Sequence, residues 1–205
     1  MNRKQCEITD PEQIAKILSK ATIGRLATVD AGNYPYITPV NFVYYQNNIY
    51  FHCAAKGEKL ENIKRNTKVC FQVDIPLAYL DAGFTNHTSP CNLHQFYHCV
   101  ILRGRARVVA EEQLKTDALN ALVEKHERGG LLKKVQADMA DYKACEVVEI
   151  HPERISAKSD LAQGKSTRVK AQIAAYLRQR NRPGDLETIR EMGMDGLSCD
   201  RLQQD

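Results

Sequence analysis

The chain has 205 residues, of which 43% are hydrophobic and 26% charged, and its formal net charge is +4 at pH 7. This length fits one domain with an appendage and allows a substantial single core. The balanced composition excludes a disordered chain, and no apolar run approaches the roughly 20 residues that a membrane-spanning helix needs. The mild charge does not indicate a nucleic-acid partner, so we expect neither nucleic acid nor membrane binding.

The amino terminus and the cysteines both favour a cytoplasmic protein. The first seven residues carry charge and lead into no apolar segment, so we expect no secretory signal. Seven cysteines are scattered singly, without a CxxC pair. In a chain without a signal, this pattern indicates reduced thiols rather than disulfides.

Short helices and β-rich runs alternate along the first 150 residues. Strands are expected where β-branched and aromatic residues cluster between turn residues, and helices where apolar residues recur at helical spacing. In chain order, the expected elements are a helix over 11–20, strands over 21–29, 36–45 and 49–53, a helix over 59–65, a strand over 69–73, a loop over 74–95, a strand over 96–109, a helix over 111–127 and a strand over 144–150. The strands 36–45 and 49–53 flank a tight turn and should form a hairpin.

Two regions depart from this alternation. The segment 74–95 is rich in Pro, Gly and Asn and is too long for an ordinary connection, so we expect a functional or mobile loop that holds the substrate side of a site. Pro152 is expected to close the last strand. Beyond Ser159 the composition shifts to Lys, Arg and Gln, which predicts an amphipathic helix followed by a loosely structured tail.

The predicted fold class is mainly β (α+β). Six antiparallel strands with few helices predict a small closed or partly closed barrel with flanking helices. We expect residues 1–158 to form this domain and residues 159–205 to form a helical extension that is not an independent domain. The chain contains no GxGxxG, GxxxxGK[ST] or GxSxG segment, which removes the common dinucleotide, nucleotide and hydrolase interpretations.

One segment has the chemistry of an anion site. From Phe51 to Leu60, a strand runs into a loop of small residues and then into the first turn of a helix, where free backbone N–H groups and the helix dipole favour an anion. Lys56 and Lys59 add positive charge, and His52 adds a donor. The segment is compatible with a phosphate site and equally with solvated surface lysines.

Several segments of the chain resemble a known family in their residues, their order and their spacing. They are Ile23-Gly24-Arg25-Leu26-Ala27-Thr28-Val29-Asp30, Pro35 to Tyr44, Ile49-Tyr50-Phe51-His52, Lys59-Leu60-Glu61-Asn62-Ile63, Val69 to Asp74 and Tyr97 to Ala106. Together they resemble the pyridoxamine 5′-phosphate oxidase-like superfamily, and within it the group that includes nitroimidazole-resistance proteins. The resemblance covers residues 23–150.

The resemblance implies a six-stranded split β-barrel that forms a homodimer, with two FMN molecules at the interface. It implies that Thr38, Pro39, Val40 and Asn41 line the flavin ring, that Phe51, His52 and Lys59 approach the ribityl phosphate, and that Tyr97, His98 and Cys99 lie near the cofactor. The chain departs from the family pattern at His98 and Cys99, because a serine or a polar amide is expected at the latter position. FAD or haem are the alternative cofactors.

His52 is the candidate catalytic residue. A histidine at a strand end is by itself more often a structural hydrogen-bonding residue, whereas the resemblance favours contact with the cofactor. We also consider His52 as a proton donor to the reduced substrate.

A second set of polar residues lies in the predicted loop and the strand after it. It consists of His87, Cys91, His94, His98 and Cys99. The spacings Cys91 to His94 and His94 to His98 could hold zinc, but His98 and Cys99 would point to opposite faces of a strand. We therefore expect structural or cofactor-cleft roles and no metal. The CxxCH pattern of covalent haem is absent.

Arginines form a third set. Arg103, Arg105 and Arg107 alternate along one strand and should share one face, which is expected to be solvated. The basic helix near the carboxyl terminus is likewise expected to be a solvated surface.

The predicted function is that of an FMN-binding flavoprotein that reduces a small electrophilic acceptor such as a nitroaromatic. The flavin would supply the electrons, and the protein would supply binding, orientation and electrostatics. Two alternatives remain open: an oxidase of a vitamer phosphate on the same barrel, and a nonenzymatic flavin or haem carrier.

Overall fold

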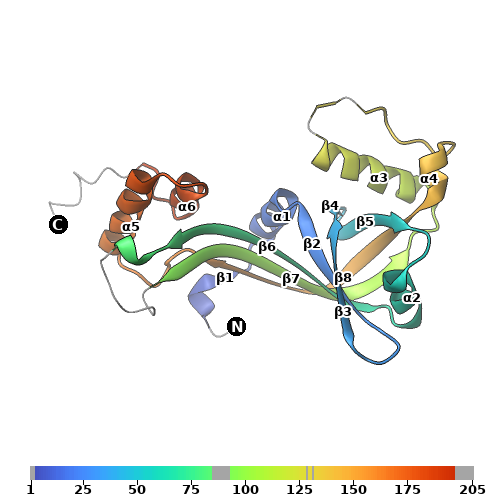
Figure 1. Cartoon of the computed structure of the whole chain (residues 1–205), viewed down its shortest axis with the longest axis horizontal. Helices are drawn as coiled ribbons and strands as arrows, with labels where there is room; N and C mark the ends of the chain where they lie inside the picture. Colours follow the sequence, from blue (N-terminus) through green and yellow to red (C-terminus); the bar gives the residue numbers. More distant parts are fainter. Residues whose placement is uncertain (1–2, 85–92, 128, 131, 197–205) are drawn as a thin grey trace. The chain divides into compact units, whose positions relative to one another are not determined.

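The computed structural model describes residues 3–84, 93–127, 129–130 and 132–196 (Figure 1). The strands are β1 (Glu7–Ile8), β2 (Ile23–Val29), β3 (Pro35–Asn41), β4 (Val43–Tyr45), β5 (Asn48–Ala54), β6 (Lys68–Leu80), β7 (His94–Val108) and β8 (Cys145–Asp160). The α-helices are α1 (Pro11–Lys20), α2 (Glu58–Arg65), α3 (Glu112–His126), α4 (Ala140–Ala144), α5 (Thr167–Arg180) and α6 (Asp185–Glu191), and two 3₁₀ turns are η1 (Lys4–Cys6) and η2 (Ala82–Phe84). None of the helices in these ranges is long and apolar enough to cross a membrane.

All of these strands belong to one sheet. Its order is β3-β2-β6-β7-β8-β5-β4, and β1 pairs with β8. The registers of β2 with β3, of β2 with β6 and of β5 with β8 are all antiparallel. The predicted α+β split-barrel fold is confirmed, although the described residues form eight strands rather than six.

The chain divides into two compact units. We name residues 9–73 and 100–156 the barrel unit, and the described residues of 1–8, 74–99 and 157–205 the terminal unit. Strands β6, β7 and β8 contribute residues to both. The predicted division into a domain of residues 1–158 and an extension of residues 159–205 stays a prediction.

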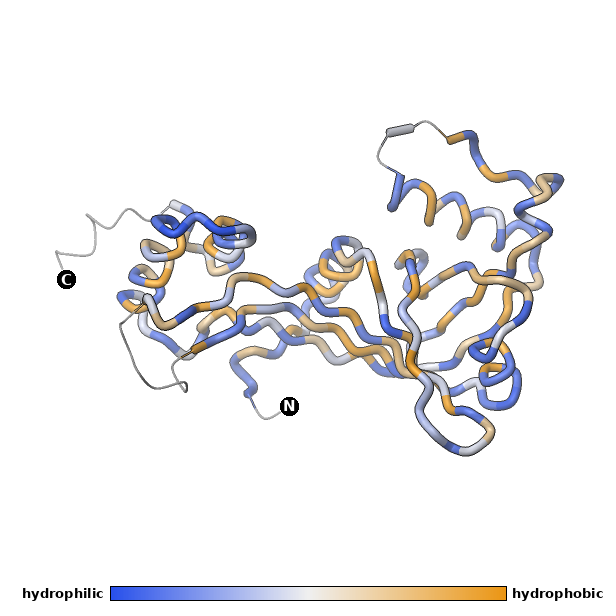
Figure 2. Tube along the Cα trace, in the orientation of Figure 1, coloured by the Kyte–Doolittle hydropathy of each residue, from blue (hydrophilic) through white to orange (hydrophobic). Residues whose placement is uncertain are grey.

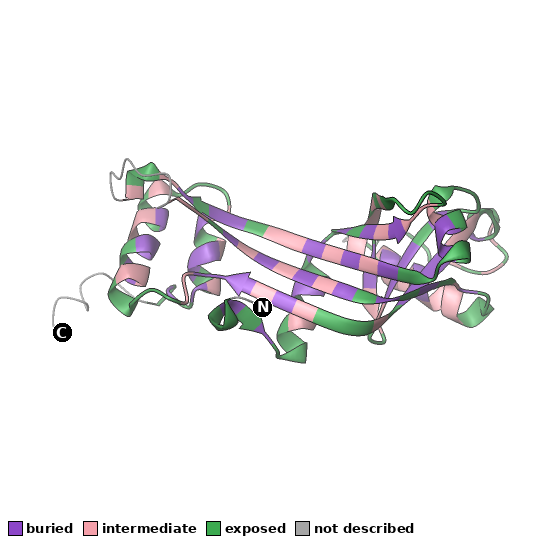
Figure 3. Ribbon diagram, turned by 90° about the horizontal axis from the view of Figure 1, so that it is seen from below, coloured by how far each residue is buried: buried purple, intermediate pink, exposed green. Residues whose placement is uncertain are grey.

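The barrel unit has an aromatic core. Leu26, Phe51 and Phe71 are fully buried, and the Phe42 and Phe71 rings meet edge to face with their centroids 5.0 Å apart. Hydrophobic and hydrophilic residues alternate along the strands (Figure 2), and the buried and exposed bands of the long strands follow the same period (Figure 3). This period of two is what a strand with one buried face requires.

The predicted helices of the barrel unit are confirmed. Helix α1 spans the predicted residues 11–20, and the Asp10 carboxylate caps it by accepting a hydrogen bond from the Glu12 backbone N–H at 3.1 Å. Helices α2 and α3 lie within one residue of the predicted ranges at each end. Apolar periodicity therefore predicts all three helices, and a local side-chain cap adds to it only at α1.

The predicted strand 36–45 is wrong as a single element, because it divides at Phe42. Residues 35–41 pair with β2, and residues 43–45 pair with β5. The Phe42 side chain is fully buried, and its carbonyl oxygen accepts a hydrogen bond from the His126 ring at 3.1 Å instead of joining a ladder. Of the predicted strand 36–45, only residues 43–45 form the predicted hairpin with β5.

The predicted loop 74–95 is also wrong at both of its ends. Strand β6 continues through Pro76 to Leu80, and β7 begins at His94. Side chains supply partners beyond the proline, because the Ala78 N–H donates to the Thr188 hydroxyl and the Gln95 amide donates to the Leu77 carbonyl, both at 2.8 Å. Of the substrate loop expected over residues 75–95, residues 75–80 and 94–95 therefore belong to strands, and residues 85–92 lie outside the described ranges.

Pro152 does not close the last strand, since β8 runs from Cys145 to Asp160. Pro152 lies beside Gly104 of β7, where a Cβ atom would overlap the backbone of His151 and touch that of Pro152. The missing side chain at Gly104 lets β8 approach closely and pass the proline.

The tail beyond residue 159 is more ordered than predicted up to Met194. Helices α5 and α6 enclose a core with the ends of β6 and β7, built around Leu80, Phe96, Ile173, Leu177 and Ile189. The Arg180 guanidinium joins this core by bonding the Asp185 carboxylate at 2.5 Å and the Asp81 carboxylate at 3.0 Å. The final residues 197–205 lie outside the described ranges.

We predict that Gly104→Ala lowers the stability of the fold by about 3 kcal/mol or more, because the new methyl group would overlap a backbone carbonyl that cannot rotate away. Urea unfolding of purified protein measures the change. The control is Gly164→Ala, where the nearest atom to the new Cβ is 3.9 Å away. Equal midpoints for the two variants would contradict the close approach of β8 to Gly104.

Candidate functional site

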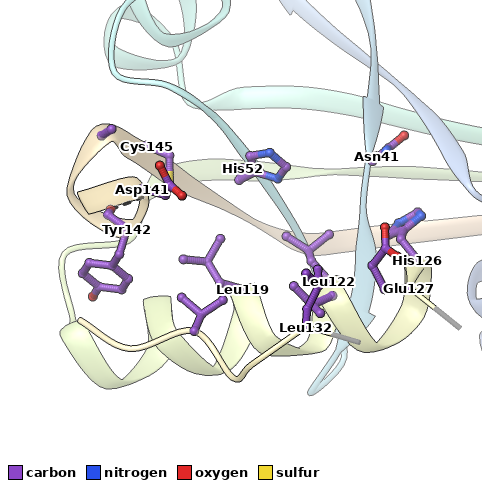
Figure 4. A pocket seen from close by; sticks show the side chains of 13 residues that line it. Asn41, His52, Leu119, Leu122, His126, Glu127, Leu132, Asp141, Tyr142 and Cys145 are labelled. Carbon is purple, nitrogen blue, oxygen red and sulfur yellow. Dashed lines mark hydrogen bonds between the residues drawn. The ribbon is translucent and has the colours of Figure 1, made fainter. Parts of the chain in front are cut away.

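The barrel unit contains a pocket of about 490 Å³ on the side of β5 that faces α3 (Figure 4). Aliphatic side chains of α3 and of the segment that follows it make the apolar wall; they are Leu119, Leu122, Val123, Leu132 and Val135. Polar groups at the pocket come from Asn41, His52, His126, Glu127 and Asp141. An apolar wall with a few polar groups is the usual character of a small-molecule site.

Strand alternation places His52 at this pocket. His52 lies opposite Val147 in the antiparallel register of β5 and β8, and its side chain is exposed. The preceding residue, Phe51, points the other way and is fully buried. The aromatic side chain of Phe51 is therefore committed to the core, and a cofactor could meet this residue only through its backbone.

The same alternation divides the four predicted ring contacts on β3. Thr38 lies opposite Leu26 and is half-buried, whereas Asn41 lies opposite Ile23 and is exposed. Val40 shares the face of Thr38, and Pro39 shares the face of Asn41. One ligand can thus meet the side chains of only two of these residues on a given face. Of the four, Asn41 lines the pocket with His52.

Strand β3 also offers backbone groups. It stands at one end of the sheet order, so within the part of the chain that the structure describes one of its edges is unpaired with another strand. The N–H and C=O groups along such an edge can bond a ligand.

Lys59 lies in the first turn of α2, directly after the loop that leaves β5. The helix begins after Gly57, which has a φ of 141° and provides no side-chain cap. Burial raises the pKa of the Cys53 thiol, and the charge of Lys59 opposes that rise, which places the Lys59 ammonium near the end of β5. Glu58 and Glu61 contribute opposite charge to the same turn.

The predicted residues Tyr97, His98 and Cys99 belong to the terminal unit. His98 is buried, with Nδ1 2.5 Å from the Ser159 hydroxyl and Nε2 3.4 Å from the Glu191 carboxylate of α6. The Tyr97 hydroxyl accepts a hydrogen bond from Lys158 at 2.6 Å. None of the three lines the pocket at His52, and their contact with a cofactor stays a prediction.

The sequence analysis missed the α3 side of the pocket. Leu119 and Leu122 lie in the helix predicted over 111–127, but periodicity does not say which strand a helix covers. His126 was missed as well, although its ring both lines the pocket and bonds Phe42. Its neighbour Lys125 lies 3.6 Å over the Phe42 ring, and burial lowers its pKa to about 8.

The proposed metal ligands do not gather into a site in the described ranges. No group of three His, Cys, Asp or Glu residues there could hold an ion. Cys91 lies outside those ranges, and His94 Nε2 is 3.1 Å from Asp160. The absence of a metal stays a prediction.

The arginines on β7 are exposed and share one face, as expected. Arg105 bonds Glu153 at 2.7 Å, and Arg107 bonds Glu149 at 2.5 Å. These pairs compensate the charges of Arg105 and Arg107 without a ligand.

The chain matches one protein family over most of its length. Residues 10–159 match the family described as pyridoxamine 5′-phosphate oxidase. The chain belongs to this family. No curated protein matches it.

Solved structures similar to this member of the pyridoxamine 5′-phosphate oxidase family share its fold. A provisionally named 5-nitroimidazole antibiotic resistance protein from Bacteroides thetaiotaomicron is 21% identical, with a TM-score of 0.60 over 75% of this chain and 86% of that one. The flavocytochrome Anf3 from Azotobacter vinelandii is 21% identical, with a TM-score of 0.64 over 76% and 69%. The FAD and heme binding protein from Mycobacterium smegmatis is 16% identical, with a TM-score of 0.65 over 80% and 78%.

The pocket in this family member is suited to binding rather than to nucleophilic catalysis. Its polar groups are an amide, two imidazoles, two carboxylates and the Tyr142 phenol, which donates to the Glu112 carbonyl at 3.2 Å. The Cys145 thiol donates a hydrogen bond to the Tyr142 carbonyl. Such a site can hold a flat apolar group and present a proton donor at its polar end.

Proposed function

We propose that this protein binds FMN and uses it to reduce a small electrophilic molecule such as a nitroaromatic or a quinone. The observation that carries the proposal is that His52 and Asn41, both expected to contact a flavin, line one apolar-walled pocket in a chain of the pyridoxamine 5′-phosphate oxidase family. The similar structure named for 5-nitroimidazole resistance supports the class of acceptor.

The residues after β5 fit the phosphate of FMN. The donor set consists of the Lys59 ammonium and the backbone N–H groups of the first turn of α2. A dianionic phosphate is bound well by such donors. The negative charges of Glu58 and Glu61 weaken the attraction of a phosphate to this turn. We therefore assign much of the selectivity for a phosphate to the Lys59 ammonium.

Strand β3 and helix α3 fit the rest of the molecule. The unpaired edge of β3 offers N–H and C=O groups to the polar edge of a flavin ring, and the α3 leucines offer an apolar surface. FMN, when bound, supplies the two-electron chemistry, and the protein supplies orientation and a partly dry site.

His52 is the residue that we assign to proton transfer. Its side chain is exposed at the pocket, and an imidazole can give up a proton near neutral pH. We assign to it the delivery of a proton to the acceptor as electrons arrive.

A homodimer is part of this proposal. Ile23, Ile37 and Ile155 of the barrel unit are exposed by 49%, 62% and 37% of their surface. Large aliphatic side chains at these levels of exposure are candidates for burial between two copies of the chain.

The second candidate function is noncovalent haem binding. Two imidazoles, of His52 and His126, line the pocket, and two similar structures are named for haem or as a flavocytochrome. The vitamer phosphate oxidase alternative is less well supported, because no arginine is among the described residues that line the pocket.

We predict that Lys59→Gln weakens FMN binding about tenfold and leaves riboflavin binding within twofold, since a charged hydrogen bond to phosphate contributes about 1.5–3 kcal/mol and riboflavin has no phosphate. Flavin fluorescence titration measures both constants. The matched control is Lys64→Gln, an exposed lysine in the last turn of the same helix. Equal weakening of FMN and riboflavin would remove Lys59 from the phosphate site.

We predict that His52→Gln keeps bound FMN and lowers kcat for nitroaromatic reduction by about 100-fold, the lower range for a lost general acid. Stopped-flow reoxidation of NADPH-reduced protein by the acceptor isolates this step. The control is His151→Gln, an exposed histidine on β8 that bonds Asn48. A flavin-loaded His52 variant with unchanged turnover would exclude proton transfer by this residue.

A further inference from the structure

The terminal unit contains a second pocket, of about 470 Å³. None of its lining residues lines the pocket at His52. Its residues come from Arg3 and η1, from η2, from the ends of β6, β7 and β8 with Leu93, from the loop 162–165 and from the first half of α5. A volume of this size holds a small organic molecule.

The floor of this pocket is apolar. Phe96, Leu80 and Ile173 belong to the buried core of the terminal unit, and Phe84 and Val169 pack against that core. Aromatic and branched side chains from four different elements therefore face the cavity. This surface fits the flat or chain-like apolar body of a ligand.

The rim is positively charged. Arg3 and Lys165 both line the pocket, and Lys165 has no ion-pair partner within the part of the chain that the structure describes. The start of α5, capped by Ser166, adds the positive end of a helix dipole between Lys165 and Val169. These groups favour a negatively charged group at the mouth of the cavity.

The one carboxylate at the pocket does not reverse this balance. Asp160 is buried, and its Oδ2 atom lies 3.3 Å from Arg3 and 3.5 Å from Lys158. Because Arg3 and Lys158 already compensate this charge, a cationic ligand would gain little from Asp160. Lys165 and the positive end of α5 then leave the mouth of the pocket positive.

We propose that this pocket binds an amphipathic organic anion, meaning a carboxylate or sulfonate attached to an apolar body. The apolar body lies over Phe96 and Ile173, and the anionic group lies between Arg3 and Lys165. Nothing in this assignment depends on the flavin site, because the two pockets share no residue.

The test uses two fluorescent probes that differ by one sulfonate group. Anilinonaphthalene sulfonate carries the anion, and N-phenyl-1-naphthylamine has the same apolar body without it. Both are titrated into the full chain, with and without excess FMN. We expect the sulfonate to bind more tightly than the neutral probe, and we expect FMN not to displace it.

Charge variants locate the anionic group. The double variant Arg3→Gln/Lys165→Gln should weaken sulfonate binding about fivefold or more, because each rim charge contributes up to about 1 kcal/mol. It should leave the neutral probe within twofold. The control Lys4→Gln/Lys170→Gln removes the same total charge from η1 and α5, at lysines that lie close in sequence to Arg3 and Lys165 but outside the pocket lining.

A packing variant locates the apolar body. Val169→Phe should fill part of the cavity and weaken both probes, with thermal unfolding as the check that the unit still folds. If Val169→Phe does not fold, the charge variants decide the question alone. Displacement of the sulfonate by FMN, or equal weakening by the two double variants, would overturn the proposal.

Discussion

The antiparallel register of β5 with β8 is the constraint on which the site depends. Ile49 lies opposite Ile150, and Ala54 lies opposite Cys145, so Phe51 enters the barrel core while His52 emerges beside the pocket. A slip of one residue would exchange the two side chains between faces. The fully buried Phe51 resists such a slip, because exposing its ring would cost about 1.5–3 kcal/mol.

The face of β5 opposite the core is covered by α3. Tyr50, on the same face as His52, is buried in a cluster with Leu119 and Leu122 of α3 and with Tyr142. The Tyr50 hydroxyl donates to the Glu149 carboxylate at 2.7 Å, and this bond and burial raise the pKa of Tyr50 to about 12. Helix α3 therefore packs against Tyr50 of β5. The pocket at His52 lies next to this contact, since Leu119 and Leu122 also line it.

The parts of the fold that were predictable from sequence are those with local causes. The capping of α1 by Asp10 and the turn after β2 need only neighbouring residues, and the helix over 11–20 and the end of the strand at residue 29 were both predicted. The passage of β6 through Pro76 depends on Thr188 and Gln95, which are distant in the sequence or belong to another strand. The break at Phe42 likewise depends on His126. Of the candidate site residues, His52 and Asn41 share a pocket, whereas the covering helix α3 could not be assigned to them by periodicity.

The pocket of the barrel unit and the pocket of the terminal unit thus differ in chemistry. We propose FMN binding at the pocket of the barrel unit. The most direct test is the absorption spectrum of freshly purified protein, followed by mass identification of the molecule released on heating. FMN binding predicts an absorption spectrum with the bands of oxidised flavin and a released molecule with the mass of FMN. A Soret band without flavin, or a colourless protein that takes up no added FMN, would contradict it.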